Sequence, residues 1–185
     1  AELGLVLVAP DSSPRDTGIR GATDDWDFGE GAGFYVDATR KPWSDHFRMY
    51  SYVTQELPGV IAEHFPVDPT RAGIFGHSMG GHGALTIALK NATTYRSVSA
   101  FAPIVAPTQV PWGRKALPRF LGDDADAWRR YDACELVAQH RFDGTILVDQ
   151  GLADQFMAEQ LQPERFEQAC AEAGQSLELR RHHGY

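Results

Sequence analysis

Cysteine is scarce in this sequence. Of its 185 residues only Cys134 and Cys170 are cysteines, and they form no Cys-x-x-Cys pair. The chain therefore indicates neither a disulfide framework nor a structural zinc site, since both need several ligands at short spacings. Two isolated thiols fit a reducing compartment, so we expect a cytoplasmic protein.

Long hydrophobic runs are also lacking. The longest apolar run, Leu3 to Pro10, is far shorter than the ~18 to 20 residues that cross a membrane. No basic segment precedes an apolar one, as it would in a signal peptide. We therefore expect no membrane partner. Because the chain starts at Ala1 without an initiator Met and runs directly into the strand-like Leu5 to Val8, we expect a fragment whose missing start could hold a targeting signal.

The chain also has no excess of positive charge. The chain has 17 Lys and Arg against 25 Asp and Glu, a formal net charge of -8. A general nucleic-acid binder gains affinity by neutralising phosphates, so we expect no nucleic-acid partner. With 43% hydrophobic and 11% aromatic residues the chain can bury a core, and its length predicts a single domain over residues 1–185.

Short apolar runs alternate along the chain with segments of helical spacing. Strands are expected at Gly4–Ala9, Ala72–Phe75, Val98–Ile104, Thr145–Asp149 and Leu177–Arg181. Helices are expected at Met49–Phe65, kinked near Pro58, and at Gly80–Lys90, Trp128–His140 and Pro163–Ala173, the last ended by Gly174. This alternation predicts an α/β fold with a mainly parallel sheet covered by helices on both faces.

Two longer segments lie outside these elements. Residues 12–45 are rich in glycine, aspartate and aromatic residues, and Trp26, Phe28 and Phe34 favour an ordered, packed loop. A pocket wall and a structural flap over the sheet edge explain this loop equally well. The segment from Pro107 to Pro118 is expected to be a loop or lid because prolines interrupt it.

The segment Gly76-His77-Ser78-Met79-Gly80 indicates chemistry. An expected strand precedes it and an expected helix follows, as in a nucleophile elbow, whose tight turn needs small neighbours and projects a serine over the sheet. Ser78 is the candidate nucleophile, and the Met79 N–H at the helix start is the candidate oxyanion donor. A phosphate cradle shares this layout, but the segment lacks the Gly-Lys-Ser/Thr ending of a P-loop and a Gly-x-Gly-x-x-Gly fingerprint.

A serine nucleophile needs a base, usually a histidine that a carboxylate orients. In this arrangement the acid and then the histidine follow the serine along the chain, each after a strand. Asp154 fits the acid position after the strand expected at 145–149. Asp149, the last residue of that strand, is the competitor.

The base is harder to assign. His182 and His183 are the only histidines after the last expected strand. His77 lies in the elbow and His82 on the following helix, and for both we expect a structural role.

These residues closely resemble the S-formylglutathione hydrolase family, the esterase D type of α/β-hydrolase. The likeness covers essentially the whole sequence, and its matching segments are spread along it. They are Ala9–Arg15, Gly29–Thr39, Met49–Val53, Ile74–Leu85, Ser99–Ile104, Pro111–Gly113, Tyr131–Ala133, Asp149–Gly151 and Asp154–Phe156. The resemblance implies an α/β-hydrolase fold that is incomplete at both ends.

By this resemblance Ser78 is the nucleophile and Asp154 is the triad acid. The family's catalytic histidine lies in a Gly-Tyr-Asp-His-Ser pattern, whereas this sequence ends at Gly184-Tyr185, so that His182 and His183 lead towards that loop and are not the base. The family's earlier strands, second oxyanion donor and final helix have no counterpart here. We therefore expect an uncovered sheet face and strand edge, and an inactive fragment.

The implied activity is hydrolysis of S-formylglutathione, a small-molecule substrate, to glutathione and formate, without a metal or organic cofactor. Trp26 and Trp112 would belong to the substrate pocket. Arg114 and Lys115 would suit the carboxylates of glutathione, although a solvated basic surface explains them slightly better. A homodimer is left open. The alternatives are a carboxylesterase or acyltransferase of the same superfamily, and a non-catalytic binding protein with this fold.

Overall fold

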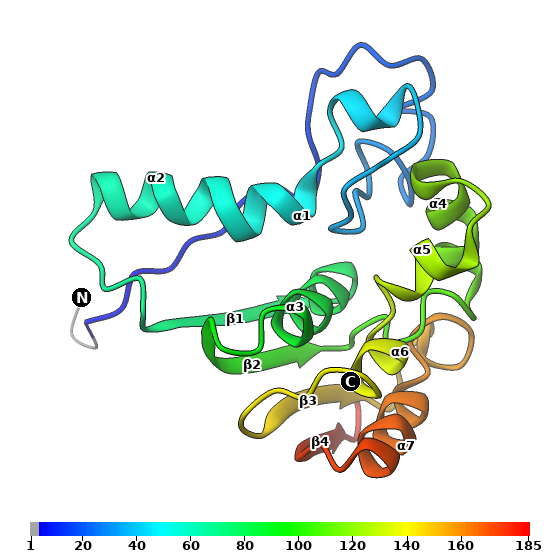
Figure 1. The fold of residues 1–185 in the computed structure, drawn as a ribbon. Coiled ribbons are helices and arrows are strands. Elements are labelled where there is room, and N and C mark those ends of the chain that lie inside the picture. The colour runs from blue at the N-terminus through cyan, green and yellow to red at the C-terminus, as the bar shows by residue number, and fades with distance from the viewer. Residues whose placement is uncertain (1–3) are drawn as a thin grey trace.

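The computed structural model describes residues 4–185, in which strands and helices alternate from residue 72 onward (Figure 1). The helices are α1 (Met49–Ser51), α2 (Leu57–His64), α3 (Met79–Lys90), α4 (Pro111–Leu121), α5 (Ala125–Arg129), α6 (Ala133–Val137) and α7 (Pro163–Ala173). The strands are β1 (Ala72–His77), β2 (Tyr95–Phe101), β3 (Ile146–Gly151) and β4 (Leu177–His182). Tighter or wider helical turns occupy Trp43–Asp45, Tyr52–Glu56 and Met157–Leu161.

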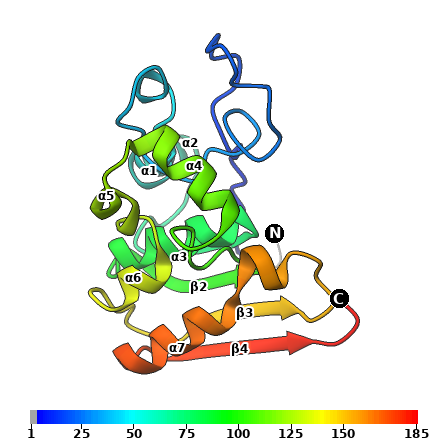
Figure 2. The ribbon, with the colours of Figure 1, turned by 90° about the vertical axis from the view of Figure 1, so that its right-hand side faces the viewer.

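The four strands form one parallel sheet in the order β1-β2-β3-β4. A parallel pair needs a crossover connection, and each crossover here runs through at least one helix. Side chains of α3, α6 and α7 share one buried cluster with Val98 and Ala100 of β2 and Ile146 and Val148 of β3. Figure 2 shows α6 and α7 on the near side of the strands. The prediction of an α/β fold with a parallel sheet is confirmed.

The other face of the sheet is largely exposed. Phe75 of β1 and Phe101 of β2 project from it with their ring centroids 6.5 Å apart, and Phe75 is 59% exposed. Within residues 4–185 no helix covers these two rings, and β1 is the first strand of the sheet, without a neighbour on its outer edge. The prediction of helices on both faces is therefore wrong for the part of the chain that the structure describes, because α3, α6 and α7 pack on one face only. An uncovered face and edge agree with what the family resemblance implied.

Four of the five expected strands are present, with ends shifted by up to three residues. The fifth, expected at Gly4–Ala9, is wrong, because this segment has no regular structure and pairs with no strand in the described part of the chain. Leu5 and Leu7 are 76% and 72% exposed. An apolar run becomes a buried strand only where a neighbouring strand satisfies its backbone and a layer covers its side chains.

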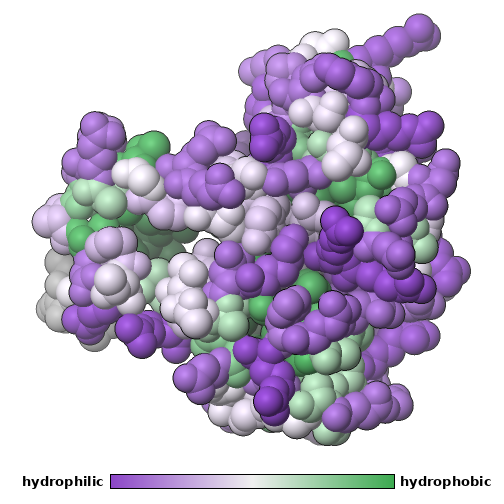
Figure 3. Space-filling model, in the orientation of Figure 1, coloured by the Kyte–Doolittle hydropathy of each residue, from purple (hydrophilic) through white to green (hydrophobic). Residues whose placement is uncertain are grey.

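The helix expected at 49–65 is present from Met49 to His64, and its regular hydrogen bonding is replaced by a wider turn over Tyr52–Glu56. This turn ends just before Pro58, which has no N–H to donate. The expected packing role is wrong for α2, because none of its residues is buried and Val60 is half exposed. Figure 3 shows hydrophobic surface at the end of the molecule where Figure 1 places α2.

The segment expected as a loop or lid at 107–118 is mostly helix α4, so that prediction is wrong. Pro111 occupies the first position of α4, where its missing N–H costs nothing, and Pro118 lies in the last turn. The helix expected at 128–140 is divided into α5 and α6. Asp132 separates them, because its carboxylate accepts hydrogen bonds from the N–H groups of Cys134 and Glu135 and so begins a new helix.

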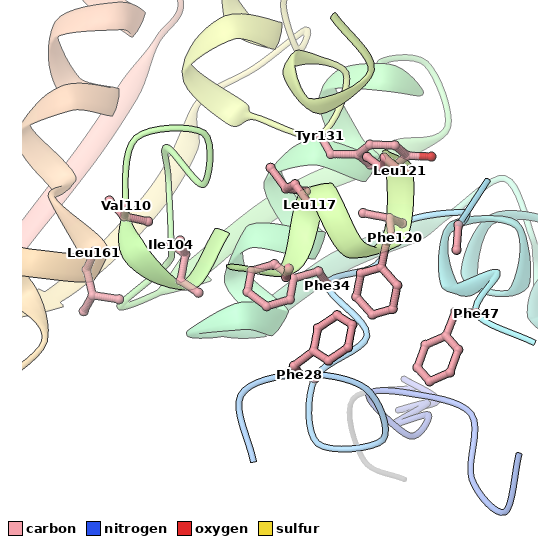
Figure 4. Packing of buried hydrophobic residues seen from close by; sticks show 14 of the residues in the cluster. Phe28, Phe34, Phe47, Ile104, Val110, Leu117, Phe120, Leu121, Tyr131 and Leu161 are labelled. Atoms are coloured by element: carbon pink, nitrogen blue, oxygen red, sulfur yellow. The ribbon is translucent and has the colours of Figure 1, made fainter. Parts of the chain in front are cut away.

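The loop at 12–45 is ordered by packing, as predicted. Phe28 and Phe34 are buried, and they join Phe47 and α4 residues Leu117 and Phe120 in a second core cluster (Figure 4). Ring centroids of Phe28 and Phe120 are 4.7 Å apart. The loop therefore forms a layer with α4 beside the carboxyl ends of the strands.

No helix formed by residues 4–185 combines the length and the apolar character that crossing a lipid bilayer requires.

Candidate active site at the turn between β1 and α3

Ser78 joins β1 to α3 in a strained backbone conformation, with φ 55° and ψ −116°. Non-glycine residues rarely adopt a positive φ, and here hydrogen bonds on both sides hold it. The Ser78 N–H donates to the Phe101 carbonyl at 2.8 Å, and the Ser78 carbonyl accepts from the His82 N–H at 3.0 Å. Within residues 4–185 the hydroxyl makes no capping bond to α3, so it is left available at the edge of the sheet.

Gly76 makes this turn possible. A Cβ on Gly76 would lie 2.1 Å from the Gly80 carbonyl oxygen and 2.3 Å from its carbon. Both contacts involve backbone, which cannot turn away as a flexible side chain can. The small residue expected at this position of an elbow is therefore required by the geometry.

Replacing Gly76 with alanine should destabilise the protein by about 3 kcal/mol, because the clash forces β1 and α3 apart. Gly59→Ala is the matched control: Gly59 lies exposed inside α2, and a Cβ there would meet nothing within 4 Å. It should stabilise by roughly 0.5–1 kcal/mol, since alanine favours the helix. Urea unfolding of both variants gives the free energies. Equal midpoints for the two variants would contradict the clash.

Met79 is the first residue of α3. The N–H groups of the first helical turn have no partner inside the helix and carry the positive end of its dipole. The Met79 N–H therefore stands next to Ser78 at the end of the helix that attracts negative charge. The side chain of Met79 packs against the second core cluster.

Asp154 lies in the loop that follows β3, three residues after its end, and is partly buried. Its Oδ1 accepts a hydrogen bond from the Phe156 N–H at 2.8 Å, and its carbonyl accepts one from the Met157 N–H at 3.1 Å. Ser78 and Asp154 thus follow β1 and β3 at the same edge of one parallel sheet.

Asp149, the competitor for the acid position, is bound elsewhere. Its Oδ1 lies 2.5 Å from His182 Nε2, and its side chain is 17% exposed. The pair lies on the exposed face of the sheet, because Asp149 is in register with Phe101. His182 is the last residue of β4, as the resemblance indicated for its approach to a loop.

The two other histidines near the elbow differ in burial. His77 ends β1 and is exposed, whereas His82 on α3 is fully buried. Burial lowers the pKa of His82 to about 4, so that its ring is neutral at pH 7. Nε2 lies 3.0 Å from the Phe34 carbonyl oxygen and must carry the proton, since a carbonyl only accepts. The sequence pointed to a structural role for His82 but contained no signal for this partner.

Trp26 and Trp112 contact each other close to the loop that contains Asp154. Their rings are in edge contact at 5.6 Å, and the Trp112 ring lies 4.9 Å from Phe156. Trp26 is 71% exposed. The row of three aromatic rings therefore runs from the loop at 12–45 across α4 to the Asp154 loop. The sequence did not single out Phe156 for this contact, although it belongs to the Asp154–Phe156 segment that carries the family resemblance.

Two of the three basic residues of α4, Lys115 and Arg119, are paired with carboxylates of the loop at 12–45. Lys115 Nζ lies 3.1 Å from an Asp25 carboxylate oxygen and 2.5 Å from one of Asp27, and Arg119 lies 3.3 Å from Asp25. Lys115 therefore ties the loop at 12–45 to α4. Arg114 donates to the Thr108 carbonyl and is exposed. Of the two residues considered for glutathione carboxylates, Lys115 is neutralised by its own chain.

A surface hollow of about 220 Å³ lies between α6 and α7, and Asp132, Cys134 and Arg165 are among its lining residues. None of Ser78, Met79 and Asp154 lines it. Residues 4–185 also contain no group of three or more His, Cys, Asp or Glu side chains that could hold a metal ion.

Known proteins match this chain along its whole length. The esterase family model, described as "Putative esterase", matches residues 1–185. S-formylglutathione hydrolase of Rattus norvegicus is 54% identical, and the match covers 100% of this chain and 66% of the rat protein. The protein of that name from Arabidopsis thaliana is 52% identical, with 98% of this chain and 64% of its own length covered.

A solved structure of an S-formylglutathione hydrolase from Agrobacterium tumefaciens is 55% identical and matches with a TM-score of 0.96. The match covers 100% of this chain and 66% of that one, so the chain spans just under two thirds of the length of these relatives. A family model that matches every residue, together with a structural match of this quality, shows that the chain belongs to the esterase family and has the α/β-hydrolase fold.

Proposed function

We propose that this protein hydrolyses the thioester S-formylglutathione to glutathione and formate. The observation that carries the proposal is the 54% identity over the whole chain to a protein named for this activity. The strained turn at Ser78 supports it, because a serine held at φ 55° whose hydroxyl makes no capping bond to α3 in the described chain suits a nucleophile.

In the proposed reaction Ser78 Oγ attacks the formyl carbon while its proton passes to a histidine that Asp154 orients. The Met79 N–H donates to the oxyanion that forms. The carbon–sulfur bond then breaks, and the thiolate of glutathione takes up the proton. Water attacks the formyl ester of Ser78, which releases formate and restores the hydroxyl.

We assign none of the histidines within residues 4–185 to the role of base. His182 is bound to Asp149, and His82 is buried against the Phe34 carbonyl. Neither arrangement brings an imidazole to Asp154, whose described hydrogen bond partners are backbone groups of its own loop.

We assign Trp26 and Trp112 to a wall of the substrate site. The contact between Trp112 and Phe156 supports this, because the backbone of Phe156 binds the Asp154 carboxylate. The aromatic row therefore begins at the proposed acid. Trp26, at its far end, is exposed and can contact a ligand without first leaving a core.

We further propose a single domain over residues 1–185 and a cytoplasmic location. Cys134 and Cys170 are both free thiols, and burial raises the pKa of each, that of Cys170 to about 12. Such thiols resist oxidation, which suits a protein that keeps its cysteines reduced.

The substrate is tested by comparing kcat/KM for S-formylglutathione and for p-nitrophenyl acetate with the protein at its natural length. We expect the formyl thioester to be the better substrate. A strong preference for the oxygen ester would instead indicate a carboxylesterase. Absence of turnover with both substrates and of labelling by a fluorophosphonate probe would indicate a non-catalytic protein.

A further inference from the structure

A second strained turn lies against α3, close to the one at Ser78. Phe34 and Tyr35 have φ values of 51° and 49°, so two successive non-glycine residues are in the left-handed region. Each such residue costs of order 1 kcal/mol and persists only where surrounding contacts hold it. The elbow accounts for the strain at Ser78. The strain at Phe34 and Tyr35 needs its own explanation.

His82 supplies the contact that holds the second turn. Its Nε2–H donates to the Phe34 carbonyl at 3.0 Å, and its backbone N–H donates to the Ser78 carbonyl at 3.0 Å. The backbone bond is the ordinary helical bond of α3, so the contact that depends on the histidine itself is the side-chain bond to the second turn. Among the described residues its Nδ1 has no partner, although it is fully buried. A core position that needed only packing would be filled more favourably by an apolar side chain.

Tyr35 is the second residue of this turn, and the turn directs its side chain onto α3. A Cβ on Gly83 would lie 2.5 Å from Tyr35 Cδ2, so the ring lies directly on α3. The Tyr35 hydroxyl lies 3.9 Å from the point where a Cβ on Gly80 would stand. Since Gly80 is the second residue after Ser78, the phenol reaches the first turn of α3. Burial raises the pKa of Tyr35, which keeps the hydroxyl protonated as a donor.

We propose that the Tyr35 hydroxyl contacts the group that Ser78 attacks, and that His82 is the positioning residue that holds Tyr35 there. A neutral O–H donor beside the start of α3 suits a carbonyl or phosphoryl oxygen bound at the turn. This inference rests on the proposed function, because it takes Ser78 as the nucleophile.

The test is a double-mutant cycle on the protein at its natural length, with kcat/KM for S-formylglutathione as the readout. Tyr35→Phe keeps the ring and removes the hydroxyl, and we expect a loss of about tenfold. His82→Met removes the donor to Phe34, and we expect a similar loss. The double variant should lose no more than the larger single loss, because His82 acts through Tyr35. His82→Gln retains an N–H near the position of Nε2 and should restore most of the activity.

Thr86→Val is the matched control. Thr86 is as buried as His82 and lies one helical turn further along α3, but its hydroxyl donates only to the His82 and Gly83 carbonyls of its own helix. We expect unchanged kcat/KM. Wild-type activity in Tyr35→Phe would overturn the role of the hydroxyl. Additive losses, or no recovery in His82→Gln, would overturn the role of His82.

The rate of Ser78 labelling by a fluorophosphonate separates this inference from the substrate assignment. If the wild type is labelled but does not hydrolyse S-formylglutathione, the proposed substrate is wrong, and the same cycle is then read from labelling rates. The Tyr35 and His82 variants should still slow labelling non-additively. Labelling at the wild-type rate in both would overturn the inference alone.

Discussion

Replacing Ser78 with alanine should lower hydrolysis of S-formylglutathione by the natural-length protein by about 10⁶-fold, since loss of a serine nucleophile removes nearly all covalent catalysis. Labelling by a fluorophosphonate should disappear with it. Because the Ser78 hydroxyl makes no capping bond to α3 within the described chain, its removal should leave stability almost unchanged. Rate assays, probe labelling and thermal unfolding measure the three effects.

Ser97→Ala is the control for that experiment. Ser97 is exposed on β2, and a change there should affect neither rate nor labelling. Labelling that survives Ser78→Ala would show that another residue reacts with the probe. If Ser78→Ala fails to fold, the Ser78 hydroxyl also stabilises the structure, and the loss of activity no longer identifies the nucleophile.

Replacing Asp154 with asparagine should lower kcat by about 10⁴-fold, because an amide cannot hold the catalytic histidine in the required tautomer. The Phe156 N–H can still donate to the asparagine side-chain oxygen, so the loop should keep its conformation. KM should change much less than kcat, which separates a catalytic loss from a loss of binding.

Asp149→Asn tests the competing acid with the same chemical change. Asp149 is bound to His182 on the exposed face of the sheet. We expect only a small effect on kcat, with any change appearing in the contact between β3 and β4. A loss in Asp149→Asn as large as in Asp154→Asn would reassign the acid to Asp149.

The second core cluster shows why the packing of the loop at 12–45 was predictable while its partner α4 was not. Aromatic residues in the loop at 12–45 indicated packing, and Phe28 and Phe34 are buried. Their partner α4 was expected to be a loop, because Pro118 counts against a helix in any local rule. Contacts of Leu117 and Phe120 with the loop outweigh that local cost.

The contacts that join the site were beyond the reach of sequence patterns. Trp112 and Phe156 are 44 residues apart in the chain, and His82 and Phe34 are 48 apart, so each pair is brought together by the tertiary fold. No periodicity links such positions. Asp149 and His182 are a third case. Asp149 ends one expected strand and His182 follows another, but their pairing depends on the register of β3 with β4.

Local pattern was sufficient where short-range physics decides the outcome. The strand, glycine turn and helix around Ser78 follow from backbone sterics, and α7 begins at Pro163 and ends before Gly174, as a proline at the start and a left-handed glycine at the end require. Tertiary structure alone decided the rest. Leu5 to Val8 has the composition of a buried strand and lies exposed, because burial depends on a neighbour that the segment does not have in the described fold.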